Sequence, residues 1–426
     1  MAKESIKKIN IQDLKPGMYV ADFNLDWNDR GSHDPNFQKF LQPRLIRTDA
    51  EVESAMARGI KEIFIDVAKG AEADGITLNE IEKALSVQLM ELDDDAELAA
   101  NKVSIKPFEE EISGAAEVKT QARRIVGDVL ADARLGKQVA LGPVQDAVMG
   151  MADSMFRNPD AILSLSLIKK RDEYTFMHSV NVGVFLMSFC RALEMPEEII
   201  LRVGVGGMLH DIGKMKTPEN VLNKAGKLTD EEFFLMKEHV TYSRKILEQT
   251  PGIEEVSVFV ASQHHERFDG SGYPNGLKSD QINEFGQMAA IVDVYDAITS
   301  DRVYHKGNPP HVALKRMLDW SKFHFNPLLY QRFVQCVGIY PIGTLVRLEN
   351  GLVGVVLRSN IESLLHPVIK VIIDAKSGKK LIPKEINLMD YSKDSSKGFR
   401  IINAEPSDKW KVDPAQFMPK PELYQS

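Results

Sequence analysis

The sequence predicts a mainly α-helical protein, with one large all-helical domain, a small α+β domain before it and a β-rich extension after it. Between residues 141 and 340, apolar residues recur every three or four positions, which is the period of amphipathic helices. Before residue 69 and after residue 340, short apolar runs lie between turn residues, as in strands. A chain of 426 residues exceeds what one compact core usually holds, so several domains are expected.

The N-terminal domain is predicted to span residues 1–68 as a small α+β unit. The runs 18–23 and 62–66 favour strands, Lys15-Pro-Gly signals a turn, and residues 50–58 favour a short helix. This stretch contains no cluster of histidines, cysteines or paired carboxylates. The sequence therefore assigns it no chemistry.

Residues 69–140 are polar and helix-prone, and they are predicted to be a helical linker. The charged stretch 91–97 is typical of a solvated surface. Apolar side chains recur at helical spacing in residues 117–134, which predicts an amphipathic helix that packs on a neighbour or on a second subunit. A homodimer is therefore one expectation.

Two capping signals place helix starts inside the predicted helical domain, 141–340. Thr229-Asp-Glu-Glu232 is a capping box, and it predicts that a helix starts just before Phe233. Asn158, which precedes a proline, is expected to cap another helix.

The pattern changes to strands after Pro341. Asn350-Gly351 separates two apolar runs, which predicts a hairpin, and residues 366–374 favour another strand. We expect a β-rich extension over residues 341–405 and a polar tail over 406–426.

The composition excludes several classes of function. A net charge of −8 argues against a protein that grips DNA with a broad basic face. The N-terminus does not resemble a signal peptide, and no stretch approaches the roughly twenty apolar residues of a membrane span. The two cysteines lack the spacing of a zinc site or a disulfide framework. A cytoplasmic protein without a membrane or DNA partner is expected.

A set of histidines and carboxylates carries the chemical signal. Any one of these histidines would be an ordinary polar residue. Burying all of them without partners, however, would cost several kcal/mol, and a bound cation would satisfy them together. The histidines lie on or at the ends of predicted helices. The set is His178, His210, Asp211, His239, His264, His265 and Asp293.

This set predicts two metal ions. Imidazole and carboxylate without thiolate suit iron or manganese, with nickel or zinc as alternatives. Seven ligands exceed one tetrahedral site. Adjacent residues on a helix point about 100° apart, so His210 and Asp211 can serve different ions, or the carboxylate can bridge both. A two-metal site activates water and stabilises charge on an attacked phosphate, which indicates in-line hydrolysis of a phosphoester.

Three further residues are candidates for substrate contacts. Lys214 follows Gly213, a glycine expected to end a helix, and could reach a phosphate oxygen or simply lie on the surface. Tyr273 lies in the Gly- and Pro-rich loop 269–276, which is either a structural turn or a rigid support for substrate stacking. Arg302 could bind a second phosphate or be a surface arginine.

These motifs resemble those of the HD-GYP family, a subgroup of HD-superfamily phosphohydrolases that degrades bacterial cyclic dinucleotides. Five motifs appear in order over residues 145–340, and residues 5–135 are similar to an uncharacterised domain often found ahead of HD-GYP modules. The five motifs are Tyr174–Val182, His210–Lys214, His239, His264–Pro274 and Asp293–Arg302.

The resemblance implies metal ligands at all seven positions given above, and substrate contacts at Lys214, Tyr273 and Arg302. Some members carry a glutamate four residues before the first ligand and bind a third metal. Tyr174 stands at that position here, so two metals are expected. His305 stands where the family often has a lysine or arginine.

The resulting hypothesis is a phosphodiesterase of bacterial second-messenger signalling that hydrolyses cyclic di-GMP to pGpG, and further to GMP. His210, Asp211 and Lys214 are expected to be catalytic, and protein partners in signalling are also expected. Three alternatives stay open: hydrolysis of 3′3′-cyclic GMP-AMP, binding of a dinucleotide or partner without turnover, and a general nucleotidase. The complete ligand set favours catalysis, and the Gly-Tyr-Pro loop counts against a nucleotidase.

Overall fold

The computed structural model describes residues 6–15, 18–23, 44–46, 49–58, 60–66, 106–167, 174–224, 226–300, 307–321, 323–360, 363–392 and 395–418. They fall into two compact units, one with the described residues up to 66 and the other with those from 106 onward. The charged stretch 91–97 and the turn at Pro16-Gly17 lie outside the described residues. None of the described helices is long and apolar enough to cross a membrane.

The described residues of the N-terminal unit form an antiparallel sheet and one α-helix, which agrees with the predicted α+β class. Its core joins Val20 and Ile63 of the sheet to Ala55 of the helix, and all three are essentially fully buried. The sheet has the order β1-β4-β2-β3. The elements are β1 (Ile6–Asn10), β2 (Tyr19–Asp22), β3 (Arg44–Leu45), α3 (Asp49–Ala57) and β4 (Glu62–Asp66).

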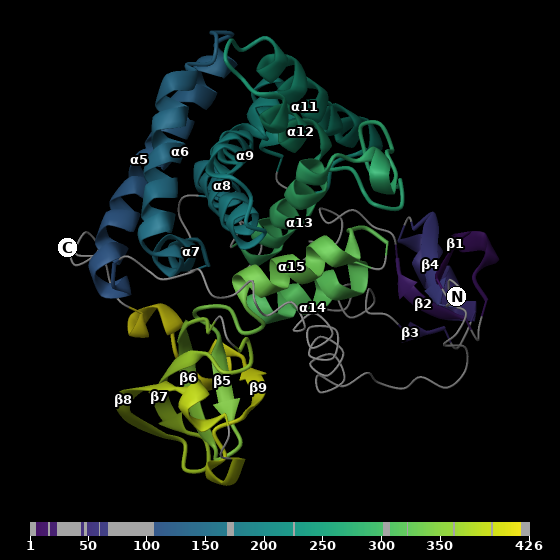
Figure 1. Ribbon diagram of the computed structural model, residues 1–426. Coiled ribbons are helices and arrows are strands. Elements are labelled where there is room, and N and C mark those ends of the chain that lie inside the picture. Colours follow the sequence, from purple (N-terminus) through teal and green to yellow (C-terminus); the bar gives the residue numbers. More distant parts are fainter. Residues whose placement is uncertain are drawn as a thin grey trace. The chain divides into compact units, whose positions relative to one another are not determined.

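The second unit begins with helices that pack around a central pair, α8 and α9. In Figure 1, α5 and α6 run side by side, and α8 lies against α9 and α13. The helices are α5 (Phe108–Arg134), α6 (Leu141–Arg157), α7 (Pro159–Leu167), α8 (Tyr174–Ala192), α9 (Glu197–Leu209), α10 (Glu219–Leu222), α11 (Asp230–Glu248), α12 (Glu255–Gln263), α13 (Glu284–Thr299), α14 (Pro310–Trp320) and α15 (Pro327–Val337).

Both predicted caps are confirmed. The Thr229 hydroxyl accepts a hydrogen bond from the Glu232 amide, and the Glu232 carboxylate accepts one from the Thr229 amide, at the start of α11. The Asn158 side-chain oxygen accepts from the amides of Asp160 and Ala161 at the start of α7. These bonds satisfy amides that have no partner within their own helix.

Glycines allow α9 to lie close to two neighbours. A Cβ added at Gly207 would lie 2.8 Å from the Cα atom of Gly183 on α8. A Cβ at Gly206 would lie 2.9 Å from the Cα atom of Ser257 on α12. Because hydrogen replaces a side chain at these contacts, three helices that carry predicted metal ligands meet near the end of α9.

The amphipathic helix predicted at 117–134 is longer than expected, because α5 begins at Phe108. Its apolar residues Ala122, Val126 and Leu130 are buried, and α5 packs on α6, α7 and α8 of the same chain. Neighbouring helices of the same chain therefore cover the apolar face of α5. The sequence had left open whether this face packs on a neighbour or on a second subunit. The domain boundaries at residues 68, 140, 340 and 405 stay predictions.

A buried carboxylate fastens α5 to α6. The Glu111 side chain is only 1% exposed, and it accepts hydrogen bonds from Ser154 Oγ at 2.8 Å and from Arg157 Nε and Nη2 at 2.9 Å. Burial alone would raise the pKa of Glu111, but the hydrogen bonds from Arg157 and Ser154 outweigh burial and lower it.

We expect Glu111→Gln to lower the free energy of unfolding by about 1–3 kcal/mol at pH 7. Since the pKa of Glu111 is lowered in the folded protein, the carboxylate stabilises the fold above its unfolded pKa, near about 4.3. That contribution disappears as the pH falls through the lower, folded-state value. Denaturant titrations at pH 7 and at about pH 3 should show a smaller gap between wild type and variant at the lower pH. The exposed Glu117→Gln on the same helix is the control, and an equal gap at both pH values would contradict the assignment.

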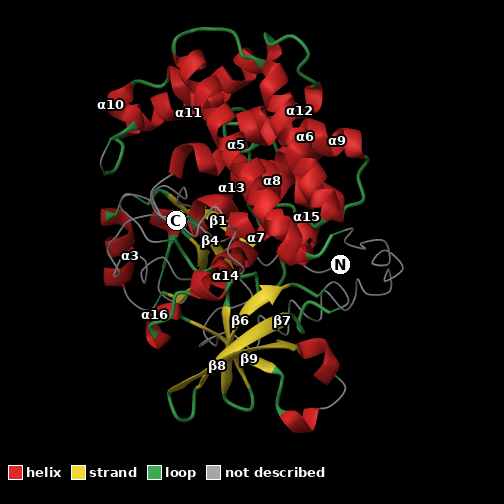
Figure 2. Ribbon diagram, turned by 90° about the vertical axis from the view of Figure 1, so that its left-hand side faces the viewer, coloured by secondary structure: helices red, strands yellow, loops and turns green. Residues whose placement is uncertain are grey.

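The β-rich extension is a five-stranded antiparallel sheet with the order β8-β7-β6-β5-β9, shown as yellow strands in Figure 2. The predicted hairpin at Asn350-Gly351 joins β5 to β6, with Gly351 at a φ of 93° that suits glycine. β8 and β9 were not predicted, and a short helix, α16 (Ser407–Trp410), lies in the predicted polar tail. The strands are β5 (Leu345–Leu348), β6 (Leu352–Arg358), β7 (Val368–Asp374), β8 (Lys379–Asn387) and β9 (Ile401–Glu405).

Candidate metal centre

The structure brings all seven predicted metal ligands together, from five helices or helix ends. His178 lies in α8, His239 in α11 and Asp293 in α13. His210 and Asp211 follow the last turn of α9, and His264 and His265 follow the last turn of α12. The seven side chains are each at least nine-tenths buried.

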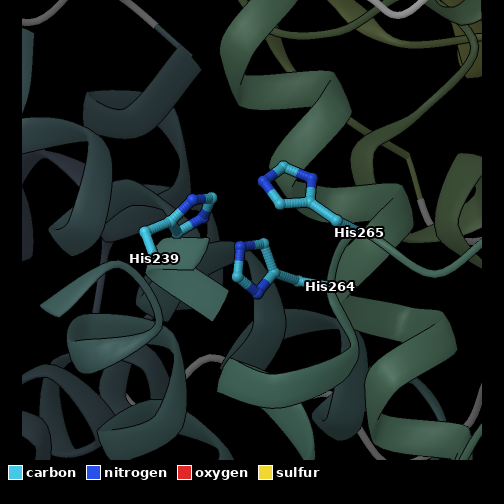
Figure 3. Close-up of side chains that lie close together, drawn as sticks. All are labelled: His239, His264 and His265. Carbon is cyan, nitrogen blue, oxygen red and sulfur yellow. The ribbon is translucent and has the colours of Figure 1, made fainter. Parts of the chain in front are cut away.

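The ligand atoms form two neighbouring groups. Within each group, one nitrogen or oxygen atom per residue lies within 4.8 Å of the others. One group is His178, His210 and Asp211, and the other is His239, His264 and His265. Figure 3 shows the three rings of the second group converging from two sides.

The two carboxylates reach both groups. Asp211 Oδ2 lies 3.2 Å from His210 Nε2, whereas Asp211 Oδ1 lies 3.3 Å from His239 Nε2. Asp293 Oδ1 lies 3.1 Å from His178 Nε2, and its Oδ2 lies 4.0 Å from His265 Nδ1. Each carboxylate therefore directs one oxygen toward each group, as a ligand shared by two ions would.

Backbone carbonyls fix the orientation of three rings. The Nδ1 atoms of His210, His239 and His264 lie 2.8, 2.6 and 2.9 Å from the carbonyl oxygens of Gly207, Met236 and Ala261, respectively. A carbonyl oxygen can only accept, so each Nδ1 donates, and in the neutral ring Nε2 keeps its lone pair. In all three histidines that lone pair points into the cluster.

The buried atoms that face the cluster fit divalent metal ions. The Nε2 atoms of His210, His239 and His264, together with Asp211 Oδ1 and Asp293 Oδ2, are buried and have no hydrogen-bond partner among the described residues. Leaving so many polar atoms unsatisfied is unfavourable. Metal ions coordinated by imidazole and carboxylate would satisfy all of them.

The electrostatics of the cluster also favour cations. Burial by itself lowers the pKa of His210, but Asp211 and Asp293 overcome burial and raise it to about 10. At His264, burial and the nearby His210 lower the pKa to about 3. Burial would raise the pKa of both carboxyls, yet the neighbouring histidines, with Lys214 beside Asp211, hold them well below the usual range. The carboxylates thus stay ionised at neutral pH and require positive charge beside them.

Two of the three predicted substrate-contact residues lie beside this cluster. Lys214 Nζ lies 2.5 Å from Asp211 Oδ2, and the Tyr273 ring stacks on His265 with centroids 4.7 Å apart. Arg302 and His305 lie outside the described residues.

The expectation that Gly213 ends a helix is wrong. α9 ends at Leu209, and Gly213 lies in a 3-10 turn, Ile212–Lys216. A Cβ added at Gly213 would lie 2.0 Å from the carbonyl oxygen of His239. The close approach of this turn to α11 is therefore what requires a glycine.

Two supporting residues were not predicted. Glu266 is buried and accepts hydrogen bonds from the amides of Asn275 and Leu277, which holds the loop that carries Tyr273. Asp296 is fully buried, and its Oδ2 lies 2.7 Å from His178 Nδ1. The spacing between Asp293 and Asp296 on one helix face was the available signal.

We expect Asp296 to hold His178 in the orientation needed for metal binding. Asp296→Leu removes the acceptor and should weaken metal binding by about 10- to 100-fold, whereas Asp296→Asn keeps an acceptor oxygen and should retain most of it. Metal content after titration with a chelator measures this, and melting temperatures control for loss of fold. Equal retention of metal by the leucine variant and the wild type would contradict this role.

Comparisons with known proteins agree with these features. The HD domain family matches residues 163–329, and a domain of unknown function, DUF3391, matches residues 6–144. The chain is 37% identical over 405 residues to the cyclic di-GMP phosphodiesterase PA4108 of Pseudomonas aeruginosa, covering 95% of this chain and 93% of that protein.

Two other phosphodiesterases match a smaller share of the chain. A cyclic di-GMP phosphodiesterase of Thermotoga maritima is 35% identical over 170 residues, or 40% of this chain and 46% of that protein. The 3′3′-cGAMP-specific phosphodiesterase 1 of Vibrio cholerae is 37% identical over 144 residues, or 34% of this chain and 33% of that protein. The ordered motifs, the clustered histidines and carboxylates, and the match to PA4108 over nearly the whole chain agree with one another. The chain therefore belongs to the HD-GYP family of HD-domain proteins and carries an N-terminal DUF3391 domain.

Proposed function

We propose that this protein is a metal-dependent phosphodiesterase that hydrolyses cyclic di-GMP. The observation that carries the proposal is the pair of carboxylates, Asp211 and Asp293, whose oxygens each face both histidine groups. The similarity to PA4108 over nearly the whole chain supports cyclic di-GMP as the substrate.

The seven clustered residues are proposed as the ligands of two divalent metal ions. Iron or manganese is favoured, with nickel or zinc as alternatives, because the donors are imidazole and carboxylate without thiolate. His178, His210 and Asp211 would hold one ion, and His239, His264 and His265 the other, with the two carboxylates shared. When bound, such ions activate water and neutralise the charge that develops on an attacked phosphate.

We propose that three side chains position the substrate and the ions. Lys214 directs its ammonium at the cluster beside Asp211, and we propose that it orients a phosphate oxygen of the substrate. Asp211 is proposed to orient the ions. Arg302 is proposed to bind the second phosphate, where its planar guanidinium can donate two hydrogen bonds. Cleavage of one phosphodiester bond gives pGpG, and cleavage of the second gives GMP.

Hydrolysis of 3′3′-cyclic GMP-AMP is a second candidate, because relatives specific for that dinucleotide match 34–41% of the chain. The greater coverage of the cyclic di-GMP relative favours cyclic di-GMP. Both substrates present the same phosphodiester to the metals, so the preference depends on contacts with the bases.

The test is an assay of protein purified without chelator and supplied with Mn²⁺ or with Fe²⁺ under anaerobic conditions. We expect wild type to convert cyclic di-GMP to pGpG and GMP, to do so faster than 3′3′-cyclic GMP-AMP, and to contain about two metal ions per chain. The double variant His210→Ala and Asp211→Ala should lose both activity and metal. A wild-type rate no higher than that of the double variant would refute the proposal.

A further inference from the structure

Two side chains on the first turns of α11 accompany Tyr273 at the edge of the metal cluster. The Phe233 ring meets the Tyr273 ring edge to face, with centroids 6.3 Å apart. The Lys237 ammonium lies 5.1 Å from the centroid of the Phe233 ring and 5.8 Å from that of Tyr273. These three residues, here called the aromatic platform, combine two flat apolar surfaces with one positive charge.

The aromatic platform is directly connected to the proposed metal ligands. Tyr273 stacks on His265, and its amide donates to the carbonyl oxygen of His265 at 3.1 Å. A nucleotide whose phosphate lies at the metal cluster would therefore meet the aromatic platform with another part of its structure.

In the described part of the chain, the Lys237 ammonium lies over two aromatic rings and is not neutralised by a carboxylate. Among the residues that the structure describes, no carboxylate forms an ion pair with its ammonium, although Lys214 and Lys224 each have such a partner. The Lys237 and Phe233 side chains are both half-buried, and the neighbouring Phe234 is 61% exposed. An ammonium near two rings, in a partly desolvated position, is suited to a hydrogen-bond acceptor on a flat ligand.

We propose that the aromatic platform binds a guanine base of the substrate, an inference that rests on the proposed function. The purine ring would pack against Phe233, because Tyr273 already stacks on His265, and the Lys237 ammonium would turn from the rings toward guanine and donate to its O6 and N7 acceptors. Adenine carries an amino group in place of O6, which would face the ammonium with a donor. Lys214 already directs its ammonium at the metal cluster, where the reacting phosphate would lie. Lys237 lies instead beside two aromatic rings, and we therefore assign it to the base rather than to that phosphate.

Two variants test the binding role. Lys237→Met keeps the apolar stem without the charge, and Phe233→Leu keeps bulk without the aromatic face. Each should raise KM for cyclic di-GMP by about tenfold and leave kcat and metal content unchanged, because a base contact is made equally in the ground state and the transition state. Lys245→Met is the matched control, since it removes an exposed lysine from the same helix and should leave KM unchanged.

A second measurement tests base selection. Cyclic di-AMP is used as a competitor of cyclic di-GMP hydrolysis, with its inhibition constant measured for wild type and Lys237→Met. We expect the variant to bind cyclic di-AMP as well as wild type does, so that the preference for guanine shrinks by about tenfold. If Lys237→Met weakens the binding of both dinucleotides by the same factor, Lys237 binds a phosphate and the base assignment is overturned.

The outcomes separate this inference from the proposed function. An active wild type whose KM is unaffected by both substitutions would refute the aromatic platform and leave the phosphodiesterase assignment intact. A wild type that turns over neither dinucleotide would refute the proposed function and the base site with it. Melting temperatures within a few degrees of wild type would show that the variants are folded.

Discussion

Replacing Asp211 by asparagine is expected to reduce hydrolysis of cyclic di-GMP by at least about a hundredfold and to lower the bound metal below two ions per chain. The carboxylate is buried, and its two oxygens face different histidine groups, at 3.2 Å from His210 Nε2 and 3.3 Å from His239 Nε2. An amide has only one oxygen that can coordinate a cation, and it lacks the negative charge. Its NH₂ group would donate a hydrogen bond to an imidazole Nε2 lone pair and would compete with the metal for that nitrogen.

The measurements are the initial rate and the metal content of the same preparation. Asp280→Asn, which changes an exposed carboxylate, is the control and should behave as wild type. If the asparagine variant kept two ions and a rate within tenfold of wild type, Asp211 would not be a shared ligand.

Replacing Gly213 by alanine is expected to destabilise the folded protein by about 3 kcal/mol or more, although only one methyl group is added. The new Cβ would lie 2.0 Å from the carbonyl oxygen of His239 and 2.4 Å from the amide nitrogen of Ser243. Both are backbone atoms of α11 and cannot rotate away. The Gly213 amide also donates to Ser243 Oγ at 2.8 Å. Relief of the clash would move α11, and His239 with it, so metal binding should weaken together with stability.

Gly142→Ala is the matched control. Gly142 lies in α6, and a Cβ at that position would meet nothing within 4 Å. Alanine is a better helix former than glycine, so this variant should be as stable as wild type or slightly more stable. Thermal melting and metal content of both variants measure the difference. A Gly213→Ala protein that melts like Gly142→Ala would show that the turn can shift without moving α11.

The sequence predicts the fold class and the membership of the histidine cluster well, because both follow from local patterns. Helical periodicity and the Thr229 capping box depend on residues that are near in the chain. The two late strands were missed for different reasons, since β8 is largely exposed and β9 pairs with β5, a strand far from it in the chain. Periodicity contains little information about an exposed edge strand.

The supporting contacts of the site could not be predicted, because they join residues that are distant in the chain. Asp296 and His178 are 118 positions apart. Phe233 and Tyr273 come from a helix and a loop whose proximity depends on how α11 and α12 pack. A glycine is likewise required at position 213 because of a backbone contact with α11. The residues next to Gly213 in the sequence do not show this contact, and they led to the wrong prediction that Gly213 ends a helix.

The carbonyl oxygens of Gly207, Met236 and Ala261 each lie one helical turn before the histidine whose ring they orient. The proposed ligand directions are therefore set by ordinary helix geometry rather than by the ions. Removal of metal with a chelator should leave a folded apoprotein with its imidazoles still aimed at the same point, unlike small zinc domains, which unfold without metal. Metal exchange should then proceed without refolding, so one polypeptide can be loaded in turn with different divalent ions and compared directly.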